Sequence, residues 1–249
     1  MTLDRTDGIW RESEVARRYL DDVAVGAIPL ENEHLAIMCR LIMYERPEVR
    51  RFMDIGCGNG ILSAVILEKY PDSSGVLVDF SETMLKAAKE KLRSNEKNLT
   101  FAMIDYGDEK WLKDLSVLCG KTSDFDVVVS RLSIHHQLDA RKIEIYKEIF
   151  DILAPGGIFV NIEHVAPASE SGSKLFADYI VDHLYDSQVK KDTGKNRDQI
   201  ARDFHERHQK DADIVAPVEK QCEWLREIGF NDVDCYFKVF DIAVFAGRK

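Results

Sequence analysis

Residues 51–63 read RFMDIGCGNGILS, in which an aspartate precedes three alternating glycines at the end of an apolar run. Glycines in such a place let the backbone approach a ligand closely. In the G-x-G-x-x-G loop that holds a dinucleotide pyrophosphate, the third glycine would fall at Ile61. A carboxylate at Asp54 would also repel a pyrophosphate, whereas it would attract an ammonium or sulfonium group. The stretch therefore predicts a ligand that is cationic near the glycines, and it disfavours a dinucleotide.

The chain around this stretch alternates between short apolar runs and amphipathic segments. The apolar runs predict strands at 50–56, 73–80, 99–106, 125–133, 158–165, 232–240 and 242–248. Helices are predicted at 60–70, 81–94, 109–118, 140–153 and 217–230, with Ser81 as an N-cap and a turn at 154–157. This order predicts an α/β fold: a doubly wound, Rossmann-like, mostly parallel seven-stranded sheet, with its ligand at the carboxyl ends of the strands.

Two segments depart from this alternation. The first residues have helical spacing, and the residues after the fifth strand lack a strand pattern but contain two amphipathic stretches, 173–191 and 197–210. A structureless loop of that length would be unusual in a compact domain, so we expect helices there. Four parts follow: a helical prefix or lid at 1–46, a core at 47–165, a helical insertion or substrate lid at 166–216, and a helix with two strands that completes the core at 217–249.

Two further acids follow predicted strands. Asp79 ends the second strand, 19 residues after Gly60, where a carboxylate accepts hydrogen bonds from both hydroxyls of a ribose. Asp105 ends the third strand, where it can bind the exocyclic amine of an adenine, and Phe80 and Met84 are placed to enclose the adenine ring. An amino acid, a ribose and an adenine together describe S-adenosylmethionine (SAM).

The same residues resemble the cofactor motifs of the class I SAM-dependent methyltransferases. That family has an acid followed by G-x-G-x-G, then a ribose acid and an adenine acid; the matching residues here are Asp54, Gly56, Gly58, Gly60, Asp79 and Asp105. The resemblance covers about residues 47–165 and 217–249, and it implies that the last two strands form an antiparallel hairpin. It also implies SAM as the cofactor and S-adenosylhomocysteine (SAH) as the product. We assign Tyr106 and Ser130 to the cofactor site as well.

The end of the fourth strand is expected to face the methyl group of SAM. It reads VVVSRLSIHHQLD and brings His135 and His136 to the cleft, and Glu163 closes the fifth strand at the same edge. Methyl transfer needs an acceptor held close to the methyl carbon and often a base to deprotonate it. We therefore assign catalytic or substrate-contact roles to these three residues.

Other histidines in this chain raise the question of a metal site. His205 and His208 fall on one face of the insertion's second helix, and with Asp211 or Asp213 they have the chemistry of a metal site. Two histidines without an assured third ligand more often belong to a solvated face. The sequence therefore predicts no metal ion.

Composition limits the class of partner. The 249 residues include 34 basic and 44 acidic ones, a formal charge of −10 that disfavours binding to nucleic acid or an anionic membrane. Residues 1–22 have no apolar core region, and no apolar run approaches the ~20 residues of a membrane-spanning helix. Five cysteines without a CxxC pair suggest a reducing compartment. We expect a cytoplasmic protein.

Several functions are compatible with these features. A methyltransferase for small molecules is expected first, because an apolar helical insertion suits a closed pocket. The alternative is a carboxy-SAM synthase-like enzyme of tRNA wobble-uridine modification, a family that uses SAM with prephenate and resembles this chain in the layout of its C-terminal part. A dinucleotide oxidoreductase and a SAM-binding scaffold subunit are weaker candidates. Trp10 and Tyr19 in the prefix suggest a homodimer.

Overall fold

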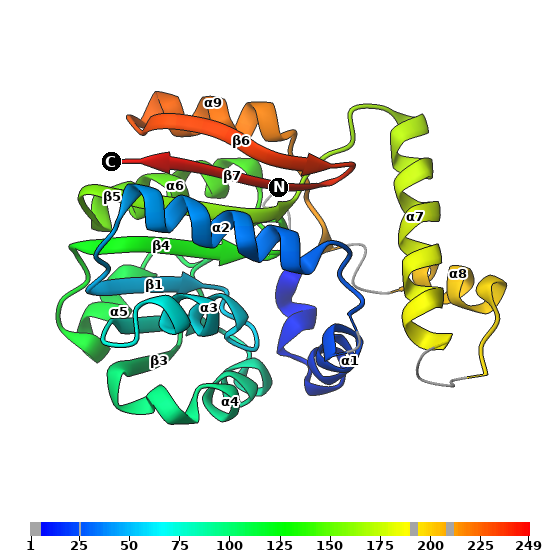
Figure 1. Ribbon diagram of the computed structural model, residues 1–249, viewed down its shortest axis with the longest axis horizontal. Helices are drawn as coiled ribbons and strands as arrows, with labels where there is room; N and C mark the ends of the chain where they lie inside the picture. The colour runs from blue at the N-terminus through cyan, green and yellow to red at the C-terminus, as the bar shows by residue number, and fades with distance from the viewer. Residues whose placement is uncertain (1–5, 25, 190–193, 208–211) are drawn as a thin grey trace.

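The computed structural model describes residues 6–24, 26–189, 194–207 and 212–249, and it contains one seven-stranded sheet (Figure 1). The strands are β1 Arg51–Ile55, β2 Ser74–Asp79, β3 Leu99–Met103, β4 Phe125–Arg131, β5 Leu153–His164, β6 Asn231–Val239 and β7 Ile242–Arg248. Their spatial order is β3-β2-β1-β4-β5-β7-β6; β1 to β5 are parallel, and β7 runs antiparallel to both of its neighbours. The predicted α/β fold and its terminal antiparallel hairpin are confirmed.

Helices cover both faces of the sheet. They are α1 Ser13–Ala24, α2 Glu31–Glu45, α3 Ile61–Lys69, α4 Glu82–Lys91, α5 Trp111–Cys119, α6 Asp139–Ile152, α7 Glu170–Val189, α8 Arg197–His205 and α9 Val218–Ile228, with short 3-10 helices η1 Asp7–Arg11, η2 Arg93–Asn98 and η3 Ile134–His136. One buried cluster joins α5, α6 and α9 to one face, and another joins α2, α3 and α4 to the opposite face. Apolar strands buried on both faces are typical of such three-layered, doubly wound sheets.

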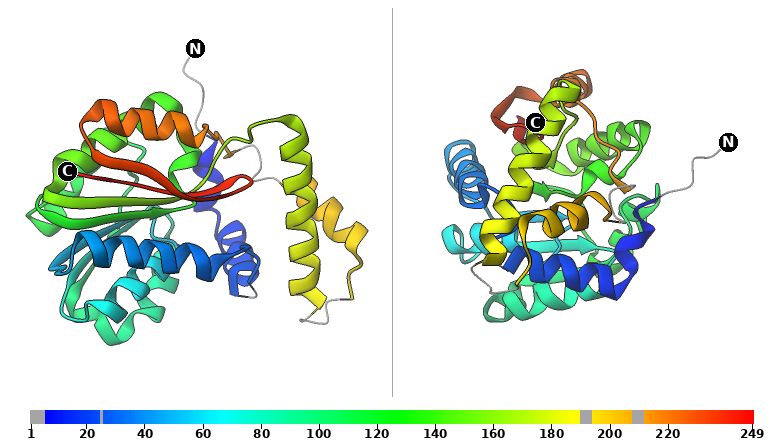
Figure 2. Two further views of the ribbon diagram at one scale, coloured as in Figure 1. Left: turned by 45° about the horizontal axis from the view of Figure 1, so that its top comes forward. Right: turned by 90° about the vertical axis from the view of Figure 1, so that its right-hand side faces the viewer.

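The ligand-binding edge of the sheet is covered from two sides. Figures 1 and 2 place α7 and α8 beyond the carboxyl ends of the parallel strands, and η1 and α1 lie near the same edge. Phe176 and Ile180 of α7 pack against Ile242 at the start of β7. The insertion therefore makes apolar contact with the core, although its role as a lid stays a prediction.

One local expectation was wrong. Residues 154–157 do not form a turn ahead of the fifth strand, because they lie within β5 as a bulge. Phe125 pairs with Leu153 and Val127 pairs with Ile158, so the extra residues of β5 bulge between two ladder pairs.

No helix in the described ranges combines the length and the apolar character that crossing a lipid bilayer requires.

Candidate functional site

The glycine loop joins β1 to α3 at the carboxyl edge of the sheet. Gly56, Gly58 and Gly60 have φ values of +63°, +50° and +76°, in the left-handed region that favours glycine. At Gly56 a side chain is also excluded by crowding, because an added Cβ would lie 1.9 Å from Oγ of Ser133. The loop thus packs directly against the segment that follows β4, and this contact brings the cofactor motif beside the predicted catalytic residues.

Two alanine variants separate backbone strain from crowding in this loop. Gly56→Ala is expected to lower the free energy of unfolding by about 2–4 kcal/mol, because it adds a clash with Ser133 to the strain of a positive φ. Gly58→Ala has open space around its Cβ and is expected to cost only the strain, about 1–2 kcal/mol. Urea unfolding measures both values. Equal losses would contradict the close approach of Gly56 to Ser133.

Asp54 lies beneath the loop and is only 1% exposed. Its carboxylate accepts hydrogen bonds from the Ser63 hydroxyl at 2.7 Å and the Ser63 backbone N–H at 3.3 Å, near the N-terminus of α3. Burial raises the pKa of Asp54 to about 7. Asp54 is not among the residues that line the adjoining cavity. Its observed contacts fix the loop on α3, and the expected attraction of a cationic ligand stays a prediction.

Asp79 lies at the end of β2 and lines the cavity. It accepts hydrogen bonds from the backbone N–H of Gly58 at 2.9 Å and of Ser81 at 2.8 Å, and it therefore orders the loops after β1 and β2 together. Burial raises the pKa of this carboxyl to about 6. Ser81 occupies the N-cap position of α4, as predicted, and its hydroxyl makes no capping hydrogen bond.

The predicted adenine site is occupied by an arginine of the prefix. Arg11 donates to Asp105 at 2.7 Å, and its guanidinium lies 4.8 Å from the centroid of the Phe80 ring. Phe80 and Met84 line the cavity, whereas Asp105 does not. An adenine that stacked on Phe80 and bonded to Asp105 would therefore displace Arg11.

Removal of this arginine is expected to strengthen SAM binding. The Arg11 side chain is 56% exposed, and an exposed ion pair contributes at most about 1 kcal/mol, so Arg11→Ala should lower the Kd for SAM by up to about fivefold. Titration calorimetry measures the change, and Arg17→Ala on the exposed side of α1 is the matched control. A higher Kd in Arg11→Ala would mean that Arg11 contacts the cofactor instead of competing with it.

A cavity of about 640 Å³ extends from the glycine loop to the insertion. Its lining includes Gly56, Gly58, Asp79, Phe80, Ser81, Met84 and Tyr106 on the cofactor side, and His135, His136, His164, Phe176, Phe204, Arg207 and Asp213 on the other side. Ser130 does not line it; the Ser130 hydroxyl is buried and donates to the Ile55 carbonyl at 2.8 Å. The assignment of Ser130 and of Gly60 to the cofactor stays a prediction.

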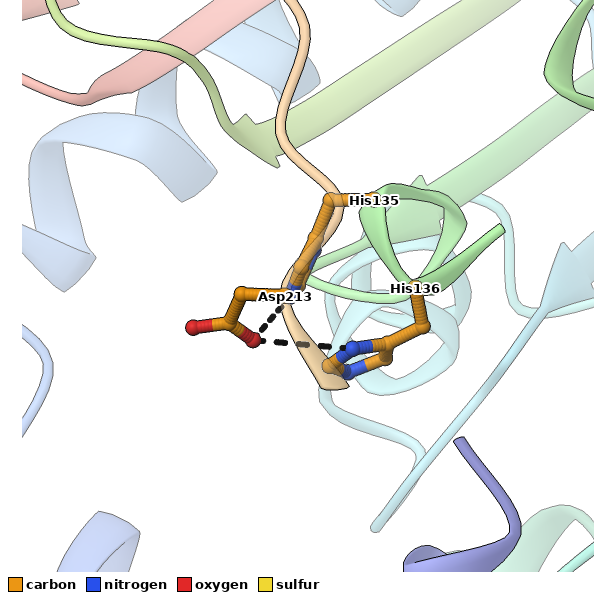
Figure 3. A group of neighbouring side chains, drawn as sticks. All are labelled: His135, His136 and Asp213. Carbon is orange, nitrogen blue, oxygen red and sulfur yellow. Dashed lines mark ion pairs between the residues drawn. The ribbon is translucent and has the colours of Figure 1, made fainter. Parts of the chain in front are cut away.

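Three imidazoles and two carboxylates meet at the far end of this cavity. His135 Nδ1 lies 2.6 Å from Glu163 Oε1, and the His135 backbone N–H also donates to this carboxylate. Asp213 Oδ1 lies 3.3 Å from His135 Nε2 and 3.6 Å from His136 Nδ1, so its carboxylate faces both rings (Figure 3). His164 Nδ1 lies 3.7 Å from Asp213 Oδ2. We call these five residues the histidine cluster.

The carboxylates set the charge of this cluster. Burial alone would lower the pKa of His135, but Glu163 and Asp213 outweigh it and raise that pKa to about 9. Burial and the neighbouring His135 lower the pKa of both His136 and His164 to about 4. The cluster therefore holds one charged and two neutral imidazoles at neutral pH.

Comparison with known proteins agrees with this site. A family model described as a methyltransferase domain matches residues 53–159, which include the glycine loop, Asp79, Asp105 and His135. Residues 53–159 form a class I SAM-dependent methyltransferase domain. The chain has the SAM-binding methyltransferase fold and is an enzyme of that fold class.

Relatives of this methyltransferase domain differ in how much of the chain they match. A carboxy-S-adenosyl-L-methionine synthase of a Nitratiruptor species is 22% identical over 241 residues, 96% of this chain and 92% of the relative. A malonyl-[acyl-carrier protein] O-methyltransferase of Ilyobacter polytropus is 30% identical over 131 residues, 53% of this chain and 46% of the relative. The solved structure of PigF with SAH has a TM-score of 0.63 at 15% identity; it is matched over 100% of this chain, which spans only 63% of the PigF chain.

The position of Asp213 beside the cluster histidines was not predicted from the sequence. The sequence analysis considered Asp213 only as a metal-site partner of His205 and His208. His208 and Asp211 lie outside the described residues. In the structure Asp213 contacts His135 and His136 instead. No local pattern could have paired them, because the contact joins segments that are far apart in the chain and depends on how the insertion returns to the core.

Proposed function

We propose that this enzyme binds SAM in the cavity and transfers its methyl group to a small-molecule acceptor held at the histidine cluster. The observation that carries the proposal is the cavity itself, which joins the loop of Gly58 and Asp79 to His135 and Asp213. Two buried polar atoms along the lining support a polar ligand. Ser81 Oγ and Trp10 Nε1 have no hydrogen-bond partner among the described residues, and a nucleoside bound beside them can supply one.

Each part of the chain has a role in this proposal. Asp79 accepts from the ribose, Phe80 and Met84 contact the adenine, and the glycines leave room for the methionine part of the cofactor. SAM supplies the methyl group and leaves as SAH. The histidine cluster positions an acceptor hydroxyl or amine and draws away its proton while the new bond forms at the methyl carbon. The helices α7 and α8 enclose the acceptor.

A second candidate is synthesis of carboxy-SAM for tRNA wobble-uridine modification. The comparisons alone support it better than the first, because the carboxy-SAM synthases match over more than nine tenths of the chain, prefix and insertion included, whereas the O-methyltransferase matches about half. The cavity chemistry supports it less well. Prephenate carries two carboxylates, and each described arginine or lysine that lines the cavity already faces a carboxylate: Arg207 lies 3.9 Å from Asp213, Arg131 lies 2.5 Å from Glu31, and Lys174 lies 2.7 Å from Glu170.

One mass-spectrometric experiment separates the candidates. Small molecules released from the purified, denatured protein are identified first, and the protein is then incubated with SAM and either prephenate or a panel of phenols, carboxylic acids, amines and thiols. SAH with a methylated acceptor would support methyl transfer, and carboxy-SAM formed only with prephenate would establish the second candidate. Bound SAM without turnover would favour a scaffold, and a nicotinamide cofactor would contradict the proposal.

A cytoplasmic location and a homodimer remain part of the proposal.

A further inference from the structure

The segment that returns from the insertion to the core is held firmly against η3. Ile214 donates its backbone N–H to the His135 carbonyl at 3.0 Å, Lys142 donates to the Ile214 carbonyl, and Ala166 donates to the Ala216 carbonyl at 3.0 Å. Asp213 lies within this segment. Its carboxylate is therefore fixed beside the two histidines by backbone contacts, which is how a preorganised ligand set is built.

We propose that His135, His136 and Asp213 bind a divalent transition-metal ion. One side-chain donor atom of each lies within 4.8 Å of the other two, and the side chains are between 6% and 18% exposed. Ligand bonds of about 2.0–2.2 Å in tetrahedral geometry separate two donor atoms by roughly 3.3–3.5 Å. The observed separations of 3.3 Å and 3.6 Å from Asp213 Oδ1 fall close to that range.

The same separations are poor for direct hydrogen bonds. A charge-assisted N–H···O bond measures about 2.7–2.9 Å, and His135 makes one of that kind to Glu163 through Nδ1, at 2.6 Å. That bond leaves Nε2 of His135 directed at Asp213. A carboxylate that holds the outer nitrogen of a ligating histidine is the usual second contact around a protein-bound metal. Glu163 has that role here.

The ligand set also indicates the class of metal. Imidazole and carboxylate donors suit zinc and its neighbours in the first transition series.

One ligand would change its partner when the metal binds. His136 Nδ1 donates to the Ala212 carbonyl at 3.0 Å in this structure, and this hydrogen bond would be replaced by the bond from Nδ1 to the metal. His164 lies 3.7 Å from the other oxygen of Asp213, beside this group of three donors. An ion in this place faces the cavity, where it can bind an acceptor oxygen and favour loss of its proton. That catalytic role rests on the proposed function, whereas metal binding does not.

Metal content and cobalt binding test the inference on the full-length, tag-free protein. Elemental analysis should find one equivalent of a transition metal per chain, and the chelated protein should bind one equivalent of Co²⁺ with visible absorption bands. His135→Ala and Asp213→Ala should each weaken Co²⁺ binding by more than about 100-fold, and Glu163→Gln, which changes only the second contact, by about 10- to 100-fold. His183→Ala, on α7 outside the cavity lining, is the matched control and should bind Co²⁺ normally.

The outcomes separate this inference from the proposed function. Folding of each variant is checked by circular dichroism, and Asp213→Asn gives a second test if Asp213→Ala fails to fold. The inference is overturned if the folded protein binds no metal, or if Co²⁺ binds equally well to Asp213→Ala and His183→Ala. Metal binding without methyl transfer would support the site and contradict the proposed function. Methyl transfer at full rate after chelation would instead show that the side chains of the cluster activate the acceptor without a metal, and it would overturn the metal's catalytic role.

Discussion

Asp79→Ala is expected to weaken SAM binding by about 1–3 kcal/mol, the largest effect that we predict for cofactor affinity. The variant removes the carboxylate that would accept from the ribose, and it also frees the backbone N–H groups of Gly58 and Ser81, which order the two loops around the cofactor. Titration calorimetry measures the affinity. Asp72→Ala, an exposed acid before β2, is the control and should bind SAM as the unmodified protein does. An unchanged affinity in Asp79→Ala would contradict the assignment of Asp79 as the acceptor of the ribose hydroxyls.

The pH dependence of SAM binding gives a second measure of Asp79. Burial raises its pKa to about 6, so the carboxyl is ionised above pH 6 and takes up a proton as the pH falls through that value. Ribose hydroxyls donate to the ionised form, so affinity should fall on acidification and be about tenfold weaker at pH 5 than at its plateau above pH 7. Asp79→Asn should bind weakly without this dependence. If Asp79→Asn keeps the full pH profile, another group, such as Asp54, is responsible.

His135→Ala is expected to lower kcat by about 100- to 10,000-fold while the Kd for SAM changes little. His135 lies at the acceptor end of the cavity and contacts both Glu163 and Asp213, so its removal dismantles the histidine cluster and spares the glycine loop. Steady-state kinetics with the acceptor found by mass spectrometry, together with calorimetry for SAM, measures the two effects. His183→Ala should retain both values.

Two results would contradict the role given to His135. A kcat close to that of the unmodified protein would show that the histidine cluster does not activate the acceptor. A large rise in the Kd for SAM would place His135 in the cofactor site instead. Glu163→Gln should give an intermediate loss of kcat, because it keeps the shape of the side chain and removes the charge that holds His135.

The cofactor half of the site could be predicted because its signals are local. Gly56, Gly58 and Asp79 sit at strand ends that hydrophobic patterning already locates, and parallel strands bring their carboxyl ends to one edge. The same reasoning placed His135 and Glu163 at that edge. It could not show that Arg11 of the prefix lies against Asp105, since an exposed arginine far away in sequence carries no signal of its partner.

The sequence by itself determined the alternation of strands and helices, because period-two and helical spacing of apolar residues indicates which side chains are buried. It also determined the glycine loop after the first strand and the acids at strand ends that suit a nucleoside. Only the tertiary structure decided which side chains share the acceptor end of the cavity. Asp213 reaches His135 and His136 because the chain leaves the core through α7 and α8 and returns along η3, where backbone hydrogen bonds hold it. Such long-range contacts depend on the path of the whole chain, and no spacing of residues encodes them.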